Sequence, residues 1–216
     1  MHRHDHRALL SATILTALLS LLLSVAAIAQ PSYRARYIGS LSYDVALPSG
    51  DAHTFVEGNT SWLGLTLEGN WLVRPNMSVG FALGWQEFWK QTHEVENFDN
   101  GAISGAQYRH LNTFPLLVTS RFFSATSQDR VRPFLGIGAG TYYTRQLLDV
   151  GVNEFTSAVW QFGVAPEVGV AFAGAQGVSA QLRARYNYPI KSGDFVGGSK
   201  SYNYWSIGFG FAFAGY

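Results

Sequence analysis

The sequence contains no cysteine, and this absence removes several classes of protein at once. Structural disulfides, thiolate metal sites and a lipid-modified N-terminal cysteine are all excluded. Charged residues make up 13% of the chain, about half of the share in an average soluble domain. The formal net charge is +1, so the chain also lacks the basic surplus that marks a nucleic-acid-binding protein.

No uninterrupted apolar run after residue 30 is long enough for a membrane helix, which needs about 20 residues. The N-terminus is different. The short basic segment Met1–Arg7 precedes a leucine-rich stretch that ends in Ala27-Ile28-Ala29, a small-x-small cleavage site. We therefore predict a signal peptide over residues 1–29, cut after Ala29, and one mature domain over residues 30–216. An uncleaved helical anchor is the alternative, because the apolar stretch is longer than a usual signal core.

Aromatic residues reach 15%, and the last strand-like segment shows how they are used. In Trp205–Phe213, one face carries tryptophan, isoleucine and phenylalanine, and the other carries serine, glycine and alanine. Side chains on a strand point alternately to opposite sides, so one face is bulky and apolar while the other is nearly bare. A soluble sheet would place charge on the second face. Aromatics toward lipid and small groups toward a crowded lumen are instead typical of a small membrane barrel.

Eight such alternating segments recur along the chain. They lie at about Arg34–Ala46, Ser61–Val73, Met77–Lys90, Gln107–Phe122, Val131–Arg145, Ala158–Phe172, Val178–Ile190 and Trp205–Phe213. Long polar connections, expected outside the cell, alternate with short turns; the long ones are Pro48–Thr60, Gln91–Ala106, Leu147–Thr156 and Lys191–Tyr202. This pattern predicts an all-β fold, an eight-stranded antiparallel up-and-down transmembrane β-barrel with both termini in the periplasm.

Proline and charge positions refine this prediction. Pro115, Pro133 and Pro166 fall in or near strands, and a closed barrel has no free edge for them, so we expect bulges or strand starts there. Arg183 and Arg185 share one face in mid-segment. An arginine on the lipid face near the bilayer midplane costs roughly 2–4 kcal/mol, so both should point inward.

The charged residues predicted to face the lumen form a candidate site. They are Glu68, Arg121, Glu167, Arg183 and Arg185. Opposite charges there can pair away from water if each is also hydrogen-bonded. One interpretation is a proton or ion path. The other is a polar plug that holds the barrel together, and this one is favoured because the interior of an eight-stranded barrel is normally filled by its own side chains.

Tryptophan and tyrosine gather near the segment ends, where they predict a girdle at the lipid headgroup level. The predicted girdle residues are Trp71, Trp85, Trp89, Tyr143, Trp160, Tyr188 and Trp205. Ligand stacking is possible for some of them, but the girdle explains more of them with one cause.

The sequence resembles the small outer-membrane β-barrel family of Gram-negative bacteria, which includes OmpX-, OmpA- and OmpW-like barrels. The resemblance rests on VRPFLGIGAGTYY at 131–143, FGVAPEVG at 162–169 and the aromatic final strand. It implies a monomer in the outer membrane, in contact with lipopolysaccharide and inserted by the barrel assembly machinery. One departure is Tyr216, which is out of phase with the outward face of the last strand. The assembly signal is then weak or uses Phe213.

Two other functions compete with a role carried by the outer loops, such as adhesion, binding or a structural task. Some eight-stranded barrels modify lipid A with a histidine-based site, and the mature chain has His53, His93 and His110 near loop acids such as Asp51, Glu94, Glu96 and Asp99. Loop solvation explains these acids equally well, so we expect no enzyme, cofactor or metal. A soluble secreted barrel of the lipocalin type would instead place the bulky face around a ligand.

Overall fold

The computed structural model describes residues 37–92, 96–98, 101–103, 107–124, 130–150, 153–173, 178–195 and 198–215. The predicted signal peptide, its cleavage after Ala29, the alternative helical anchor and Tyr216 lie outside the described residues.

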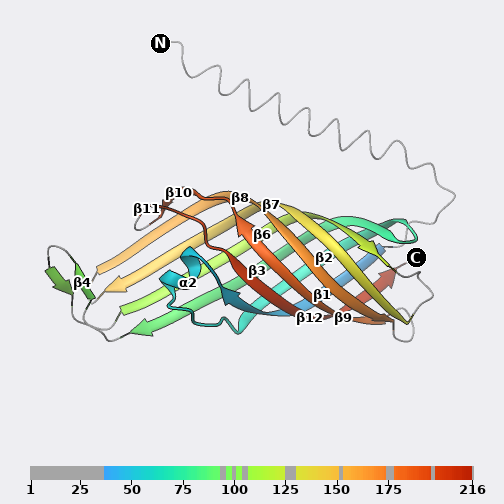
Figure 1. Ribbon diagram of the computed structural model, residues 1–216, viewed down its shortest axis with the longest axis horizontal. Coiled ribbons are helices and arrows are strands. Elements are labelled where there is room, and N and C mark those ends of the chain that lie inside the picture. The colour runs from blue at the N-terminus through green and yellow to red at the C-terminus, as the bar shows by residue number, and fades with distance from the viewer. Residues whose placement is uncertain are drawn as a thin grey trace, which may run out of the picture. The chain divides into compact units, whose positions relative to one another are not determined.

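Eight antiparallel strands in the described part of the chain form a closed ring (Figure 1). They are β1 (Tyr37–Pro48), β2 (Leu63–Arg74), β3 (Met77–Thr92), β6 (Gln107–Phe123), β7 (Val131–Val150), β8 (Asn153–Ala173), β9 (Val178–Pro189) and β12 (Tyr204–Gly215). Each strand pairs with the next along the chain, and β12 closes the ring by pairing with β1 from Tyr37↔Gly215 to Pro48↔Tyr204. The prediction of an eight-stranded up-and-down barrel is confirmed.

Shorter elements lie in three of the connections that the sequence predicted to be long. The first holds helix α2 (Asp51–Phe55), the second the hairpin of β4 (Glu96–Phe98) and β5 (Gly101–Ile103), and the fourth the hairpin of β10 (Ser192–Phe195) and β11 (Gly198–Lys200). Figure 1 shows these elements at one end of the barrel, here called the loop end, and the C-terminus at the other, here called the turn end. None of the described helices is long and apolar enough to cross a membrane.

The prediction of a third long connection over Leu147–Thr156 is wrong. Strands β7 and β8 stay paired throughout this segment, as far as Val150↔Asn153. The acidic residues Asp149 and Glu154 lie opposite each other in the register of the two strands. A strand that has left the lipid no longer needs an apolar outer face, so polar residues do not end it.

The proline prediction was partly wrong. Pro133 is the third residue of β7, near a strand start as expected. Pro115 and Pro166 lie inside β6 and β8 without a bulge: pairing passes from Leu83↔Leu116 to Gln86↔Thr113, and from Val164↔Tyr188 to Glu167↔Arg185, with the register unchanged. Both prolines remain paired with β7 on their other side. The missing N–H of each proline therefore interrupts the ladder on one side of its strand. The residue pairs before and after the gap keep the two strands in register.

Candidate functional site

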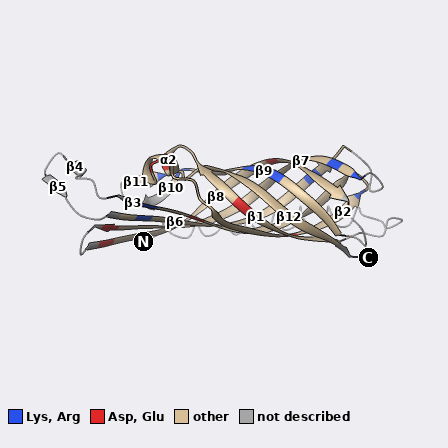
Figure 2. Cartoon of the chain, turned by 90° about the horizontal axis from the view of Figure 1, so that it is seen from below, with Lys and Arg blue, Asp and Glu red and all other residues tan. Residues whose placement is uncertain are grey.

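The alternation of side chains separates an apolar exterior from a polar interior, as the sequence predicted. On β9, Leu182 is 46% exposed while its neighbour Arg183 is 1% exposed; on β2, Leu67 is 51% exposed and Glu68 is 1% exposed. Figure 2 shows few charged positions along the wall of the barrel. The soluble lipocalin-type arrangement, with the bulky face inward, is therefore wrong for this chain.

The interior brings all five predicted charged residues together in one buried network. Arg121 on β6 binds Glu167 on β8 and, through its Nη2 atom, Glu68 on β2 at 2.8 Å. Arg185 on β9 lies between the same two carboxylates, with its Nη2 atom 2.7 Å from Glu68 and 2.6 Å from Glu167. Arg183 also donates to Glu68. Charge-assisted hydrogen bonds of this kind are the strong ones in proteins.

Glu68 is the centre of this network. Its two carboxylate oxygens accept hydrogen bonds from three guanidinium groups and from the hydroxyl of Ser40, whose Oγ lies 3.2 Å away. Glu167 accepts from two of the same arginines. Three strands that share no backbone ladder with β2 are thus linked to this side chain: β6 and β9 directly through their arginines, and β8 through Glu167, which binds two of the same arginines. Both glutamates are paired and hydrogen-bonded, which is the condition under which a buried ion-pair cluster can offset the cost of removing its charges from water.

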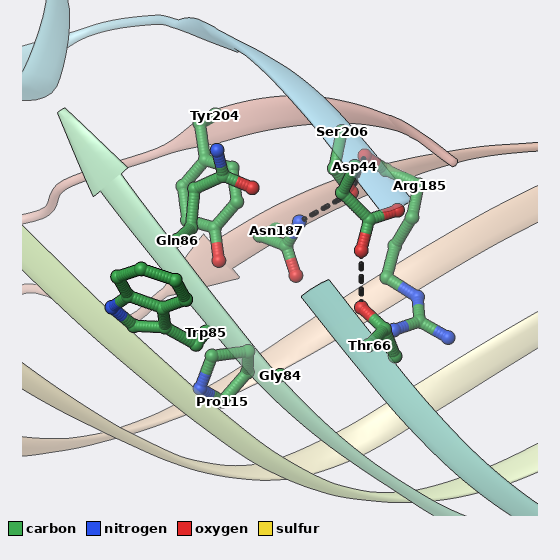
Figure 3. A pocket seen from close by; sticks show the side chains of 10 residues that line it. All are labelled: Asp44, Thr66, Gly84, Trp85, Gln86, Pro115, Arg185, Asn187, Tyr204 and Ser206. Carbon is green, nitrogen blue, oxygen red and sulfur yellow. Dashed lines mark hydrogen bonds between the residues drawn. The ribbon is translucent and has the colours of Figure 1, made fainter. Parts of the chain in front are cut away.

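Asp44 on β1 is a sixth member of the network, beyond the five residues that the sequence predicted. Its Oδ1 atom lies 2.9 Å from Nη2 of Arg183, and its Oδ2 atom accepts the hydroxyl of Thr66. In Figure 3 Asp44 and Thr66 face each other, and Asn187 lies nearby and donates to Ser206 at 3.2 Å. The small cavity among them, about 10 Å³, has room for about one water molecule.

Two glycines let the ion pairs reach across an intervening strand. Gly208 of β12 lies between Asp44 and Arg183 in the register, and a Cβ atom there would overlap the Asp44 carboxylate. Gly136 of β7 lies between Arg121 and Glu167, and a Cβ atom there would lie 2.7 Å from Oε1 of Glu167. The glycines on the inner faces of the strands therefore leave the space in which long charged side chains from the two neighbouring strands meet.

The predicted girdle residues occupy both ends of the apolar exterior. Trp71 lies at the turn end, where its ring is 5.4 Å from that of Tyr37 and 5.9 Å from that of Phe81. The other members lie toward the loop end: Trp85, Trp89, Tyr143, Trp160, Tyr188 and Trp205. There Tyr143 and Trp160 pack across β7 and β8 with ring centroids 5.1 Å apart, and Trp85 donates to Asn112 at 3.2 Å. Tryptophan donors with polar partners beside apolar rings suit a lipid headgroup level.

The mouth of the barrel at the loop end is closed by an apolar cluster that the sequence did not predict. Ala52 and Val56, on and just after α2, are fully buried against inward residues of the wall and of the last long connection. The buried partners are Ala46, Phe88, Leu111, Phe195, Tyr202 and Tyr204. Two sequence signals were available: the apolar residues of the DAHTFV segment, and inward-facing Phe88 and Leu111 where a solvated lumen would favour polar groups.

Polar contacts fix this cap in place. Asp51 accepts a hydrogen bond from the backbone N–H of Ser201 at 2.8 Å, which ties α2 to the connection before β12. Glu57 lies 3.4 Å from Lys90 and 3.5 Å from Arg109, and Arg109 also donates to the carbonyl of Phe55. Burial, helped by the nearby Asp51 carboxylate, raises the pKa of the Tyr202 phenol above its ordinary value, so this buried ring stays neutral.

The histidines do not converge in the described part of the chain. His53 lies on α2, whereas His110 lies on the outer face of β6 with Nδ1 3.4 Å from Oε1 of Glu87. His93, Glu94 and Asp99 lie outside the described residues, and Glu96 is described only as part of β4. Among the described residues, no three histidine, aspartate or glutamate side chains are grouped so that they could hold a metal ion.

Comparisons with known proteins place the fold among small outer-membrane β-barrels. Neisserial surface protein A aligns over 84% of this chain and 99% of its own, with 16% identity and a TM-score of 0.53. A major outer membrane protein of Thermus thermophilus covers 85% of this chain and 100% of its own, at 11% identity and a TM-score of 0.52.

A third similar structure is Ail, the attachment invasion locus protein of Yersinia pestis, in complex with the heparin analogue sucrose octasulfate. It aligns over 84% of this chain and 100% of its own, with 10% identity and a TM-score of 0.51. No family model and no curated protein matches the chain. At these identities the likeness establishes the fold, and the chain has the fold of a small outer-membrane β-barrel.

Proposed function

We propose that this chain is an integral protein of the bacterial outer membrane with a closed lumen, and that its role is carried by the surface at its loop end. The observation that carries the proposal is the inside-out barrel: an exterior of exposed leucine, phenylalanine and tryptophan around a buried ion-pair network. Apolar groups toward lipid and charges toward the lumen are what a bilayer demands of a barrel.

The lumen is proposed to be a plug and not a channel. The six charged side chains fill its middle, and the apolar cap of α2, Phe195 and Tyr202 fills its mouth. The interior of an eight-stranded barrel is just wide enough for side chains. An ion entering it would have to displace charges that already neutralise one another, so we assign the network a structural role.

A surface role is supported by the uneven height of the barrel wall. Pairing between β8 and β9 stops at Gly163↔Pro189, whereas β7 and β8 stay paired to Val150↔Asn153 and β3 and β6 to Thr92↔Gln107. Strands β3, β6, β7 and β8 therefore extend past their neighbours, and Phe155 on this extension is 50% exposed. An attachment protein, Ail, shares the fold, which supports binding at a surface as the task.

Three measurements test the proposal. The full-length chain expressed in a Gram-negative host should fractionate with outer membranes and show heat-modifiable gel mobility; recovery as a soluble periplasmic protein would contradict it. Pure protein in planar bilayers should give little or no stable conductance, and large reproducible single-channel steps would show that the lumen is open. The surface role predicts that replacing residues 147–156 with a short turn abolishes adherence of expressing cells while the barrel's heat-modifiability is kept.

Lipid modification is the remaining alternative, and two histidine variants separate it from the proposal. We propose no chemistry for His110, because its described partner is a single carboxylate on the lipid-facing side of the wall. Purified protein in detergent should leave lipopolysaccharide and phospholipid unhydrolysed. Turnover that disappears in His110→Ala but persists in His53→Ala would overturn the non-enzymatic assignment.

A further inference from the structure

Arg145 on β7 is an exposed cation at the loop-end border of the apolar wall. Its chain neighbours Thr144 and Gln146 are 0% and 1% exposed and face the lumen, so Arg145 faces outward. Within the part of the chain that the structure describes, its guanidinium group has no hydrogen bond or ion pair. An arginine on the outer wall is costly near the bilayer midplane and tolerated toward the interface, so its depth decides what it can bind.

The register places Arg145 directly beyond the aromatic girdle. Two residues earlier on the same face of β7, Tyr143 lies opposite Trp160 of β8, and Arg145 itself lies opposite Ala158. Two residues of a strand span about 6.6 Å, and the tilt of the strands makes their separation along the membrane normal smaller. Because tyrosine and tryptophan mark the headgroup level, the guanidinium group lies at the depth of the headgroup phosphates.

Asn112 on β6 supplies a neutral donor beside this cation. It lies opposite Arg145 in the register, and its Oδ1 atom accepts the indole N–H of Trp85 at 3.2 Å. Because tryptophan only donates, the amide oxygen of Asn112 must face it, and the amide nitrogen keeps its N–H groups for another acceptor. On the other side of Arg145, the small side chain of Ala158 is exposed and leaves the space next to the guanidinium group open.

No carboxylate lies next to Arg145 on the described outer face of these strands. Glu87 is in the same row but one strand beyond Asn112, and its Oε1 atom lies 3.4 Å from Nδ1 of His110. Asp149 is four residues further along β7, which is about 13 Å of strand. The positive charge of Arg145 is therefore not balanced locally, and a guanidinium group beside an amide donor suits the oxygen atoms of a phosphate.

We propose that Arg145 and Asn112 bind a phosphate group of lipopolysaccharide, the phosphorylated glycolipid of the outer leaflet, while Tyr143 and Trp160 contact its acyl chains. This inference rests on the proposed outer-membrane location and adds a lipid site to it. The guanidinium group binds two phosphate oxygens side by side, and the Asn112 amide donates to the same group. The bound lipid holds β6, β7 and β8 at the membrane surface, at the base of the part of the wall that extends past its neighbours.

Titration of the full mature chain in detergent with diphosphorylated lipid A, followed by native mass spectrometry, tests the site. Arg145→Gln should weaken the affinity at least fivefold. Asn112→Asp keeps the acceptor for Trp85 but puts a negative oxygen in place of the amide donor, so it should weaken the affinity by at least as much. Arg74→Gln is the matched control, because it removes an exposed arginine at the turn end of β2, and it should change the affinity less than twofold.

Dephosphorylated lipid A separates recognition of the phosphate from contact with the acyl chains. It should bind the native chain at least fivefold more weakly than the diphosphorylated form, and Arg145→Gln should not weaken it further. Equal affinity of the native chain for the two lipids, or equal losses in Arg145→Gln and Arg74→Gln, would overturn the proposal. Heat-modifiable gel mobility shows that each variant is folded, whereas recovery of the native chain as a soluble periplasmic protein would instead refute the proposed function.

Discussion

Neutralising Glu68 should destabilise the barrel more than any other single loss of charge in the network. Glu68→Gln keeps the size of the side chain but leaves Arg121, Arg183 and Arg185 facing two carboxylates in place of three. The amide nitrogen of the new glutamine would also direct its N–H donors toward the N–H donors of the arginines. Removing one partner of a buried pair typically costs about 3–5 kcal/mol, and three arginines depend on this one. We therefore expect the upper part of that range in the free energy of unfolding.

The assay is urea-induced unfolding of the mature chain in lipid vesicles, followed by tryptophan fluorescence, with heat-modifiable gel mobility as a check on folding. Glu87→Gln is the matched control, because Glu87 lies on the outer face with a single long contact to His110 and should change stability by less than about 0.5 kcal/mol. Adding Arg183→Gln to Glu68→Gln restores the charge balance and should recover part of the loss. A loss below about 1 kcal/mol for Glu68→Gln, or one equal to the control, would refute the reasoning.

Three further predictions concern the wall and the N-terminus. Leu182→Arg should lower the free energy of unfolding by roughly 2–4 kcal/mol, and lipid-soluble quenchers should reach a label at position 182 but not at 183; reversed accessibility would contradict the face assignment. Gly208→Ala should displace the Asp44 carboxylate and lower the free energy of unfolding in vesicles by about 1–3 kcal/mol. Gly39→Ala, on the outer face, should lower it less; equal losses would show that Gly208 is not needed to make room for the Asp44–Arg183 ion pair. Mass spectrometry of the mature protein should find Gln30 first, and an intact Met1 would favour the helical anchor.

The faces of the strands could be predicted because a membrane barrel leaves little freedom in them. Each residue of a strand faces either the lipid or the lumen, and the two alternate along the chain. This alternation, here called parity, was enough to place Leu182 outside and Arg183 inside. The same parity grouped Glu68, Arg121 and Glu167 before any contact was known. Register then decides which of these charges meet, and register depends on the lengths of the turns, which parity does not contain.

What the sequence did not reveal lies mostly beyond the lipid. The long pairing of β7 with β8 was missed because Asp149 and Glu154 resemble loop residues, although a strand in water tolerates charge on both faces. The cap of α2 was missed because a five-residue helix has almost no periodic signal. Asp44 was not assigned to the network because the alternation of faces places a side chain in the lumen but does not say which charges meet there, and Asp44 meets Arg183 only through the register of β1, β12 and β9.

The bridge from Asp44 over Gly208 to Arg183 has a consequence for how the ring closes. In an open sheet of these eight strands, β1 is one edge and β12 the other, so Asp44 and Arg183 lie far apart on opposite sides of the gap. Their ion pair exists in the closed ring alone. An open form lacks this ion pair, so the pair adds a side-chain contact that is made only when the ring closes. The bridge from Asp44 to Arg183 thus ties β1 to β9 across the β1–β12 seam, beside the backbone ladder that joins β1 to β12.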